Sequence, residues 1–139
     1  MSNEKDIAEE LKERFKFVGT RLRKLELKPV ENQKKEIEAE LNVSNKLKIK
    51  EITDELLVIE NNVRMFFDPK AFFELSLVLE GAYKLKEKKE DNKEFIEQHL
   101  KAIGYQLLFK TSLIVAFITE QVLEVPVILP PATTDDEDE

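Results

Sequence analysis

Hydrophobic and polar residues alternate along four segments of the chain, a pattern typical of strands with one buried and one wet face. It is clearest over residues 36–50, where the odd positions are mostly apolar and the even positions are charged or polar. The first segment also contains Gly19, a candidate bulge. Short connections, such as the turn Asp68-Pro69-Lys70, predict one antiparallel sheet. The four segments are 15–28, 36–50, 56–67 and 71–86.

Helical spacing is confined to the two ends of the chain. Residues 4–13 allow a short helix, which we expect to form a packing arm or a frayed end. Near the other end, Asp91 and Glu94 resemble a capping box that begins a helix over residues 91–101. A glycine then separates this helix from the main helix, which we expect over residues 105–123.

The main helix is apolar on every side, although 37% of the residues in the chain are charged. One sheet can cover only one side of such a helix, so the other side needs a second copy of the chain or a bound partner. Lys110 interrupts the apolar run, which is shorter than the roughly 20 residues that cross a bilayer, so we expect no membrane insertion. The interface residues predicted on this helix are Leu108, Phe109, Leu113, Val115 and Phe117.

Length and charge limit the classes to which this protein can belong. Its 139 residues fit one domain, predicted over 13–131, with an N-terminal arm over 1–12 and a disordered acidic tail over 132–139. The last five residues are all acidic and account for most of the net charge of -7. The nearly neutral body lacks the clustered basic surface that nucleic acid requires. The absence of cysteine and the charged N-terminus predict a cytoplasmic protein.

Residues for catalysis or cofactor binding are sparse. His99 is the only histidine, and the chain has no cysteine to complete a metal site with it. The serines lack the sequence context of a catalytic triad, and the three glycines are too far apart for a phosphate-binding loop. We therefore expect no enzyme activity, no cofactor and no metal.

Three segments of the second half, in their order along the chain, resemble the SecB family of export chaperones. The strand FFELSLVLEGAYKL resembles the family's aromatic strand, which ends in a glycine followed by an apolar–aromatic pair, here Ala82 and Tyr83. The segment QHLKAIGYQLLFKTSLIVAFITEQ resembles the opening of the family's long helix, and VPVILPP resembles its proline-rich exit. The chain departs from the family at Lys110 and Leu113, where the family has proline and arginine.

The resemblance implies an α+β fold, in which a four-stranded antiparallel sheet is followed by a long apolar helix packed on one face. It also implies a homo-oligomer, a dimer of dimers, that binds unfolded polypeptides without ATP. The family's acidic residue for docking the translocase motor aligns with Ser76, and Glu74 is its nearest substitute. Aromatic residues near strand ends or the helix start are the predicted client contacts: Phe66, Phe67, Phe72, Tyr83 and Tyr105.

Three functions remain open on these grounds. The leading hypothesis is a holdase chaperone for non-native polypeptides, either unfolded preproteins or an aggregation-prone antitoxin. The alternative is a dedicated interaction module that uses the same scaffold to bind one specific partner. A lipid or small-molecule carrier, with the apolar helix as a pocket wall, is the third class.

Overall fold

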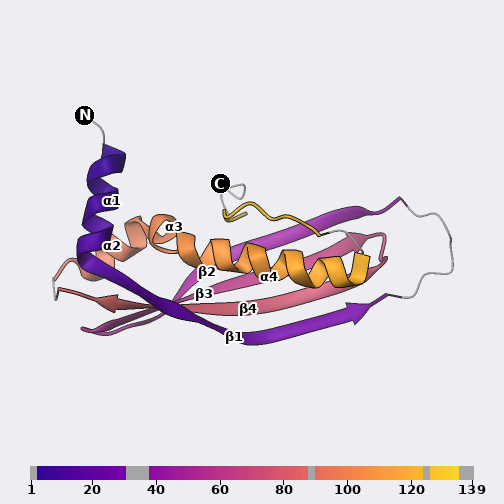
Figure 1. The fold of residues 1–139 in the computed structure, drawn as a ribbon, viewed down its shortest axis with the longest axis horizontal. Coiled ribbons are helices and arrows are strands. Elements are labelled where there is room, and N and C mark those ends of the chain that lie inside the picture. Colours follow the sequence, from indigo (N-terminus) through magenta and orange to yellow (C-terminus); the bar gives the residue numbers. More distant parts are fainter. Residues whose placement is uncertain (1–2, 31–37, 88–89, 124–125, 135–139) are drawn as a thin grey trace.

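One twisted sheet and one long helix that runs lengthwise over one of its faces form the two layers of this protein (Figure 1). The computed structural model describes residues 3–30, 38–87, 90–123 and 126–134. The elements are α1 (Asn3–Arg14), β1 (Phe15–Pro29), β2 (Glu40–Ile52), β3 (Leu56–Asp68), β4 (Phe73–Leu85), α2 (Asn92–Gln98), α3 (Leu100–Ile103) and α4 (Tyr105–Leu123).

The sheet has four antiparallel strands, as predicted, in the order β1-β4-β3-β2. β1 and β2 therefore lie at opposite edges, and the connection between them is not a hairpin. β1 instead pairs with β4 along its whole length, from Phe15 opposite Leu85 to Pro29 opposite Phe73. The register shifts next to Gly19, which confirms the predicted bulge, and shifts again after Leu22.

The core lies between α4 and the face of the sheet formed by the odd-numbered residues of β3 and β4. All of these positions are buried, and they are apolar except for Asn61 and Gly81. Asn61 donates a hydrogen bond of 2.7 Å from Nδ2 to Oγ1 of Thr111 on α4. This buried polar pair fixes the position of the helix along the sheet, because a shift of either partner would leave the other without its bond.

The predicted helix over 91–101 is instead two short helices, α2 and α3, that meet at His99. The capping box was a wrong prediction, because Asp91 forms no side-chain cap hydrogen bond with α2 and accepts hydrogen bonds from Arg14 instead. The break at Gly104 is confirmed. A Cβ atom there would lie 2.9 Å from the side chain of Leu47, so glycine allows the corner between α3 and α4 to approach β2 closely.

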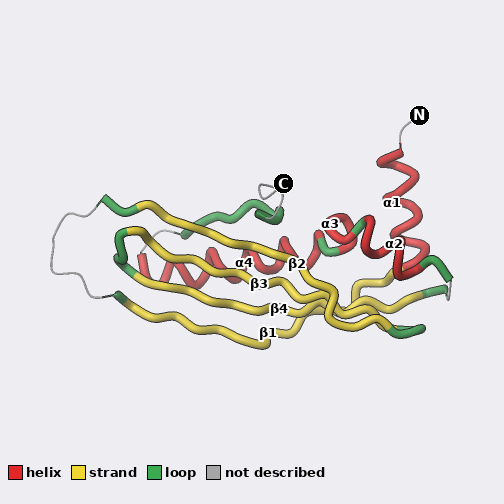
Figure 2. The backbone as a smooth tube through the Cα atoms, turned by 180° about the vertical axis from the view of Figure 1, so that it is seen from behind, coloured by secondary structure: helices red, strands yellow, loops and turns green. Residues whose placement is uncertain are grey.

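Residues 126–134 run beside α4 on the side of β2 (Figures 1 and 2). We call this segment the strap. Ala132 and Thr134 are hydrogen-bonded to Asn45 on β2, so the predicted disordered tail over 132–139 begins too early. Its last part, 135–139, lies outside the described residues.

Candidate interaction surface

One side of α4 faces away from the sheet and is lined by large apolar side chains. Tyr105, Phe109, Leu113 and Phe117 follow one another at intervals of four residues and are between 48% and 67% exposed. This spacing places them on one stripe of the helix, which we call the α4 stripe. The opposite side of α4 is buried through Leu107, Leu108, Thr111, Val115 and Thr119.

Three exposed leucines of β1 lie on the same side of the sheet as α4. Residues paired across an antiparallel ladder share a face, and Leu22, Leu25 and Leu27 pair with the buried leucines Leu79, Leu77 and Leu75 of β4. β1 is an edge strand, so these side chains are 36% to 47% exposed rather than covered. The side of the protein that carries α4 therefore presents apolar surface on both the helix and the sheet edge.

The structure places the five predicted interface residues in two groups. Phe109, Leu113 and Phe117 belong to the α4 stripe and can contact another molecule. Leu108 and Val115 are buried within the protomer, so their side chains cannot. The sequence interpretation did not separate the two groups, because apolar residues occur on every side of α4 and exposed polar residues such as Lys110 and Glu120 are interspersed among them.

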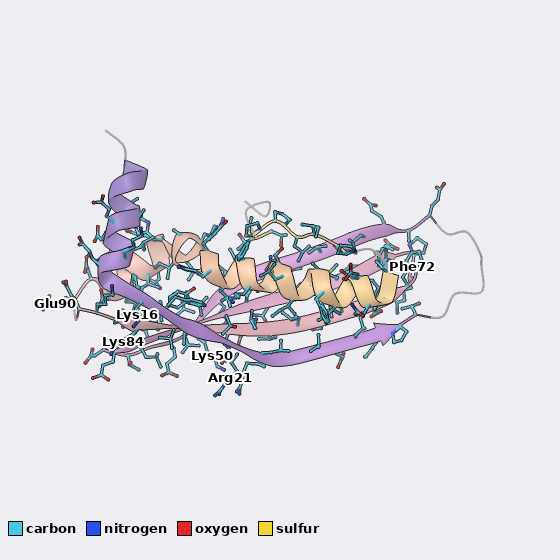
Figure 3. The ribbon with its side chains drawn as sticks, in the orientation of Figure 1. Lys16, Arg21, Lys50, Phe72, Lys84 and Glu90 are labelled. Atoms are coloured by element: carbon cyan, nitrogen blue, oxygen red, sulfur yellow. The ribbon has the colours of Figure 1, made fainter. Side chains whose placement is uncertain are left out.

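The five predicted client contacts fall at opposite ends of the sheet. Tyr83 and Tyr105 lie at the end of the sheet where α1 leads into β1, and Phe66, Phe67 and Phe72 lie near the β3–β4 hairpin. Figure 3 shows this separation, with Phe72 at one end of the molecule and Lys84, the neighbour of Tyr83, toward the other. No single groove among the described residues brings all five together.

Tyr83 and Tyr105 line an apolar cavity of about 410 Å³ at the foot of α1. Leu11 of α1, Phe15 and Phe17 of β1, and Ile103 of α3 also line it. Tyr105 is half exposed at this site, whereas Tyr83 is buried. Burial raises the pKa of the Tyr83 phenol, although the backbone N–H of Leu107 nearby acts in the opposite direction. Among the described residues, no group forms a well-aligned hydrogen bond with its hydroxyl.

Arg14 holds α1 in place beside the cavity. Both views of the backbone show α1 standing away from the sheet (Figures 1 and 2). The buried guanidinium of Arg14 donates hydrogen bonds to Asp91 and Asn92, pairs with Glu10 at 2.7 Å, and lies 4.0 Å from the ring centre of Phe95. Burial alone would lower the pKa of Arg14, but the hydrogen bond to Asp91 and the charges of Glu10 and Asp91 raise it. The side chain therefore remains charged and fastens one wall of the cavity.

At the hairpin end, Phe67 is largely buried, and the exposed Phe72 packs edge-on against it at 4.9 Å between ring centres. Phe72 has a backbone φ of 58°, in the left-handed region that favours glycine. Phe66 belongs to the even-numbered residues of β3 and so points to the other face of the sheet, where Arg64 lies 5.5 Å from its ring centre.

The predicted motor-docking residues Glu74 and Ser76 also lie on this other face of the sheet, away from α4. Lys70 is 3.9 Å from Glu74, and Lys28 stands opposite it in the ladder. Ser76 lies between Glu26 and Arg64 in the paired strands. The charge of Glu74 is thus partly balanced by its neighbours.

The described residues hold no group of three or more histidine or acidic side chains that could bind a metal ion. His99 packs against Phe95 with 4.6 Å between ring centres, which is a structural contact. Of the helices in the described ranges, α4 alone is long and apolar enough to cross a membrane. That is weak evidence for a span, because a core helix that packs on a sheet meets the same test.

Two of the buried polar residues that the sequence interpretation overlooked are asparagines on strands. Asn45 and Asn61 each occupy an inward position in a row of otherwise mostly apolar residues. Asn61 anchors α4 through Thr111, and Asn45 anchors the strap. Such an interruption of the apolar row is the signal that could have identified both contacts.

The sequence matches no protein-family model and no curated protein. A SecB-like chaperone from Mycobacterium tuberculosis, in complex with a ChAD peptide from the HigA1 antitoxin, has a similar structure. The TM-score is 0.67 at 10% sequence identity, over 91% of this chain and 96% of that chain. A protein of unknown function from Streptococcus agalactiae has a TM-score of 0.52 at 12% identity, over 84% and 96% of the two chains. The chain therefore has a SecB-like fold, as predicted.

Proposed function

We propose that this protein is a cytoplasmic holdase that binds non-native or extended polypeptides without ATP. The α4 stripe carries this proposal, because a folded domain rarely leaves a row of large apolar side chains uncovered unless another molecule binds there. A polypeptide that covers the stripe or the exposed leucines of β1 removes apolar surface from water on both partners. Binding at either surface requires neither a nucleotide nor a reactive side chain.

Separate apolar sites suit a client that is long and extended. The cavity at Tyr83 and Tyr105 and the exposed rings of Phe66 and Phe72 lie toward opposite ends of the sheet, so one folded ligand of small size cannot use them together. Ordering a disordered client is costly, so each site alone is expected to bind weakly. Simultaneous contact with several sites then supplies the affinity.

A second copy of the chain is the proposed cover for part of the α4 stripe. Tyr105, Phe109, Leu113 and Phe117 together expose roughly 400 Å² of apolar surface, if about half of each side chain is accessible. At about 25 cal/mol per Å², burying this area corresponds to about 10 kcal/mol per protomer before the cost of association. We propose a homo-oligomer, a dimer of dimers, in which α4 lies between sheets.

The alternative is a dedicated module that binds one partner. The similar M. tuberculosis chaperone is in complex with an antitoxin peptide, which supports a peptide segment, and an antitoxin in particular, as the partner of this chain. If unfolded preproteins are the clients and a translocase motor receives them, Glu74 is the proposed motor contact, because Ser76 carries no charge.

Suppression of aggregation distinguishes these functions. Several unrelated proteins are unfolded and diluted into buffer with increasing amounts of this protein, and light scattering is recorded. A holdase protects most of them, and Phe109→Ser combined with Phe117→Ser weakens protection while the control variant Gln98→Ser, exposed on α2, does not. Protection of none, with tight binding of a single partner, supports the dedicated module. Protection of none without any partner refutes both proposals.

A further inference from the structure

The face of the sheet opposite α4 has a hollow of about 390 Å³ near the end where α1 leads into β1. Two of the smallest residues stand side by side in its floor, because Gly19 of β1 lies opposite Ala82 of β4. A Cβ atom at Gly19 would have no neighbour within 4 Å, so the bulge leaves open space there. The other apolar residues that line the site are Val18, Leu56 and Val58. We call this site the outer hollow.

Cations without partners stand at both ends of the outer hollow. At one end, Lys16 and Lys84 lie directly opposite each other in the β1–β4 ladder. At the other end, Arg21 lines the hollow opposite Glu80. None of these three cations forms an ion pair with another described residue. Figure 3 shows Lys16, Arg21, Lys50 and Lys84 in the half of the sheet nearer α1. Like charges that face each other across a ladder are destabilising, and an anion bound beside Lys16 and Lys84 would relieve this repulsion.

The carboxylates near the outer hollow leave these cations available. Glu80 accepts a hydrogen bond from Nζ of Lys50 and lies 3.8 Å from Nε of Arg23, so its charge is already balanced. Glu51 stands opposite Val58 on the β2 side of the hollow. The side formed by β1 and β4 is therefore the cationic one.

The spacing of the cations fits an extended peptide. Lys84 is four residues beyond Glu80 along β4, so the two cationic ends are about 13 Å apart. In an extended chain, side chains at positions i, i+2 and i+4 share a face, and the outer two are also about 13 Å apart. Acidic residues at the outer positions then reach the cations, and an apolar residue between them lies on the floor. A nucleic acid has a charge on every nucleotide and would place phosphates over Glu80 and over this floor.

We propose that the outer hollow is a docking site for an extended acidic segment of a partner protein, in which an apolar residue lies between two acidic residues at alternate positions. The inference goes beyond the proposed function, because it uses neither the α4 stripe nor the leucines of β1. The site also lies at the opposite end of the β1–β4 ladder from Glu74 and Ser76. A molecule that holds a client on the α4 side can thus bind an acidic partner on its other face.

Two peptides of identical composition test the predicted spacing. The probe is Gly-Glu-Thr-Leu-Thr-Glu-Gly with blocked ends and a dye, and the control is Gly-Leu-Thr-Glu-Glu-Thr-Gly. Fluorescence anisotropy is recorded in about 0.05 M salt as the concentration of this protein rises, because screening weakens such contacts in more salt. We expect the probe to bind at least fivefold more tightly than the control.

Substitutions in the outer hollow test the position of the site. Lys84→Gln and Arg21→Gln should each weaken binding of the probe by about two- to fivefold, the range of an exposed ion pair. Lys93→Gln removes the same charge from an exposed position of α2 and should have no effect. Ala82→Glu should abolish binding, because it fills the floor with a carboxylate. Circular dichroism establishes that each variant is folded.

Equal affinity for the two peptides would overturn the inference, as would an equal loss in Lys93→Gln and Lys84→Gln, because both results indicate attraction by net charge alone. A single-stranded DNA oligomer that binds more tightly than the probe would overturn the choice of partner. The aggregation assay separates this inference from the proposed function. Protection of clients without any binding of the probe refutes the outer hollow alone, and binding of the probe without protection refutes the holdase alone.

Discussion

Replacing Leu113 with lysine separates assembly from folding. Leu113 is 52% exposed at the middle of the α4 stripe, one turn from both Phe109 and Phe117. In a single protomer the new ammonium group can reach water, so the free energy of unfolding should change by less than about 0.5 kcal/mol. In an assembly that covers this side of α4, the same group loses its water and gains no partner.

The cost of that burial sets the size of the expected effect. An unpaired charge buried at an interface destabilises it by about 3–5 kcal/mol, which corresponds to a dissociation constant roughly 10²- to 10⁴-fold higher. Val115→Lys is the informative contrast, because Val115 is fully buried against its own sheet and the substitution should unfold the protomer. Gln98→Lys adds the same charge at an exposed position of α2, away from the α4 stripe, and should change neither property.

Light scattering coupled to size-exclusion chromatography measures the mass, and urea unfolding measures the stability. The wild type should elute as a multiple of the 16.2 kDa chain, and Leu113→Lys should shift toward a single chain at micromolar concentration with an unchanged unfolding midpoint. A wild-type protein of 16.2 kDa would contradict the proposed oligomer directly. A variant that retains the native mass would show that another surface holds the copies together.

Three further substitutions test the cavity, the hairpin and the attachment of α1. Burial raises the pKa of Tyr83 above 10.0, so the folded protein retains a proton that the unfolded chain releases. This stabilising contribution is complete below about pH 10, and above it the free energy of unfolding falls by about 1.4 kcal/mol per pH unit. Urea unfolding measured against pH should show this fall in the wild type and not in Tyr83→Phe. Phe72→Gly relieves a left-handed backbone but loses the contact with Phe67, so the free energy of unfolding should change by less than about 1 kcal/mol. Protection of clients should weaken in the scattering assay. If protection is unchanged, Phe72 is not a client contact. Arg14→Met removes the charge that joins α1 to Asp91 and should lower the free energy of unfolding by about 2–4 kcal/mol. Arg14→Lys should recover only part of this loss, because an ammonium group lacks the forked geometry of a guanidinium. An unchanged unfolding curve would show that other contacts hold α1 in place.

The strands could be predicted because their signal is local. Alternation with a period of two requires only neighbouring residues, and it identified all four strands, with the β3–β4 turn between Asp68 and Phe73. Strand order was not accessible in the same way, since the pairing of β1 with β4 joins residues far apart in the sequence. One local signal remained unused. Leu22 and Leu25 are three residues apart rather than two, and the register of β1 shifts between them.

The interaction surface was predictable in kind but not in detail. The apolar residues on every side of α4 predict that something covers it. The α4 stripe is exposed in the protomer, and its cover stays a prediction. Hydrophobicity alone does not show which apolar residues of α4 face the sheet. Two threonines are the better signal for the side of α4 that faces inward. Thr111 and Thr119 are fully buried because their hydroxyl groups bond to carbonyls of their own helix and to Asn61 or the strap. Polar residues at buried positions thus marked the inner side of α4, which its apolar residues could not.

Charge decides which of the two exposed apolar surfaces is better suited to self-association. The exposed side of α4 carries Lys110 and Glu120, whose charges cancel. β1 instead has five cations and one carboxylate, so two copies of this edge paired side by side would bring strands of like charge to within about 5 Å. Assembly through β1 should therefore strengthen as salt rises from about 0.01 to 1 M, because the Debye length falls from about 30 to 3 Å. Assembly through α4 should be nearly independent of salt, so the salt dependence of the assembly mass identifies which of the two surfaces joins the copies.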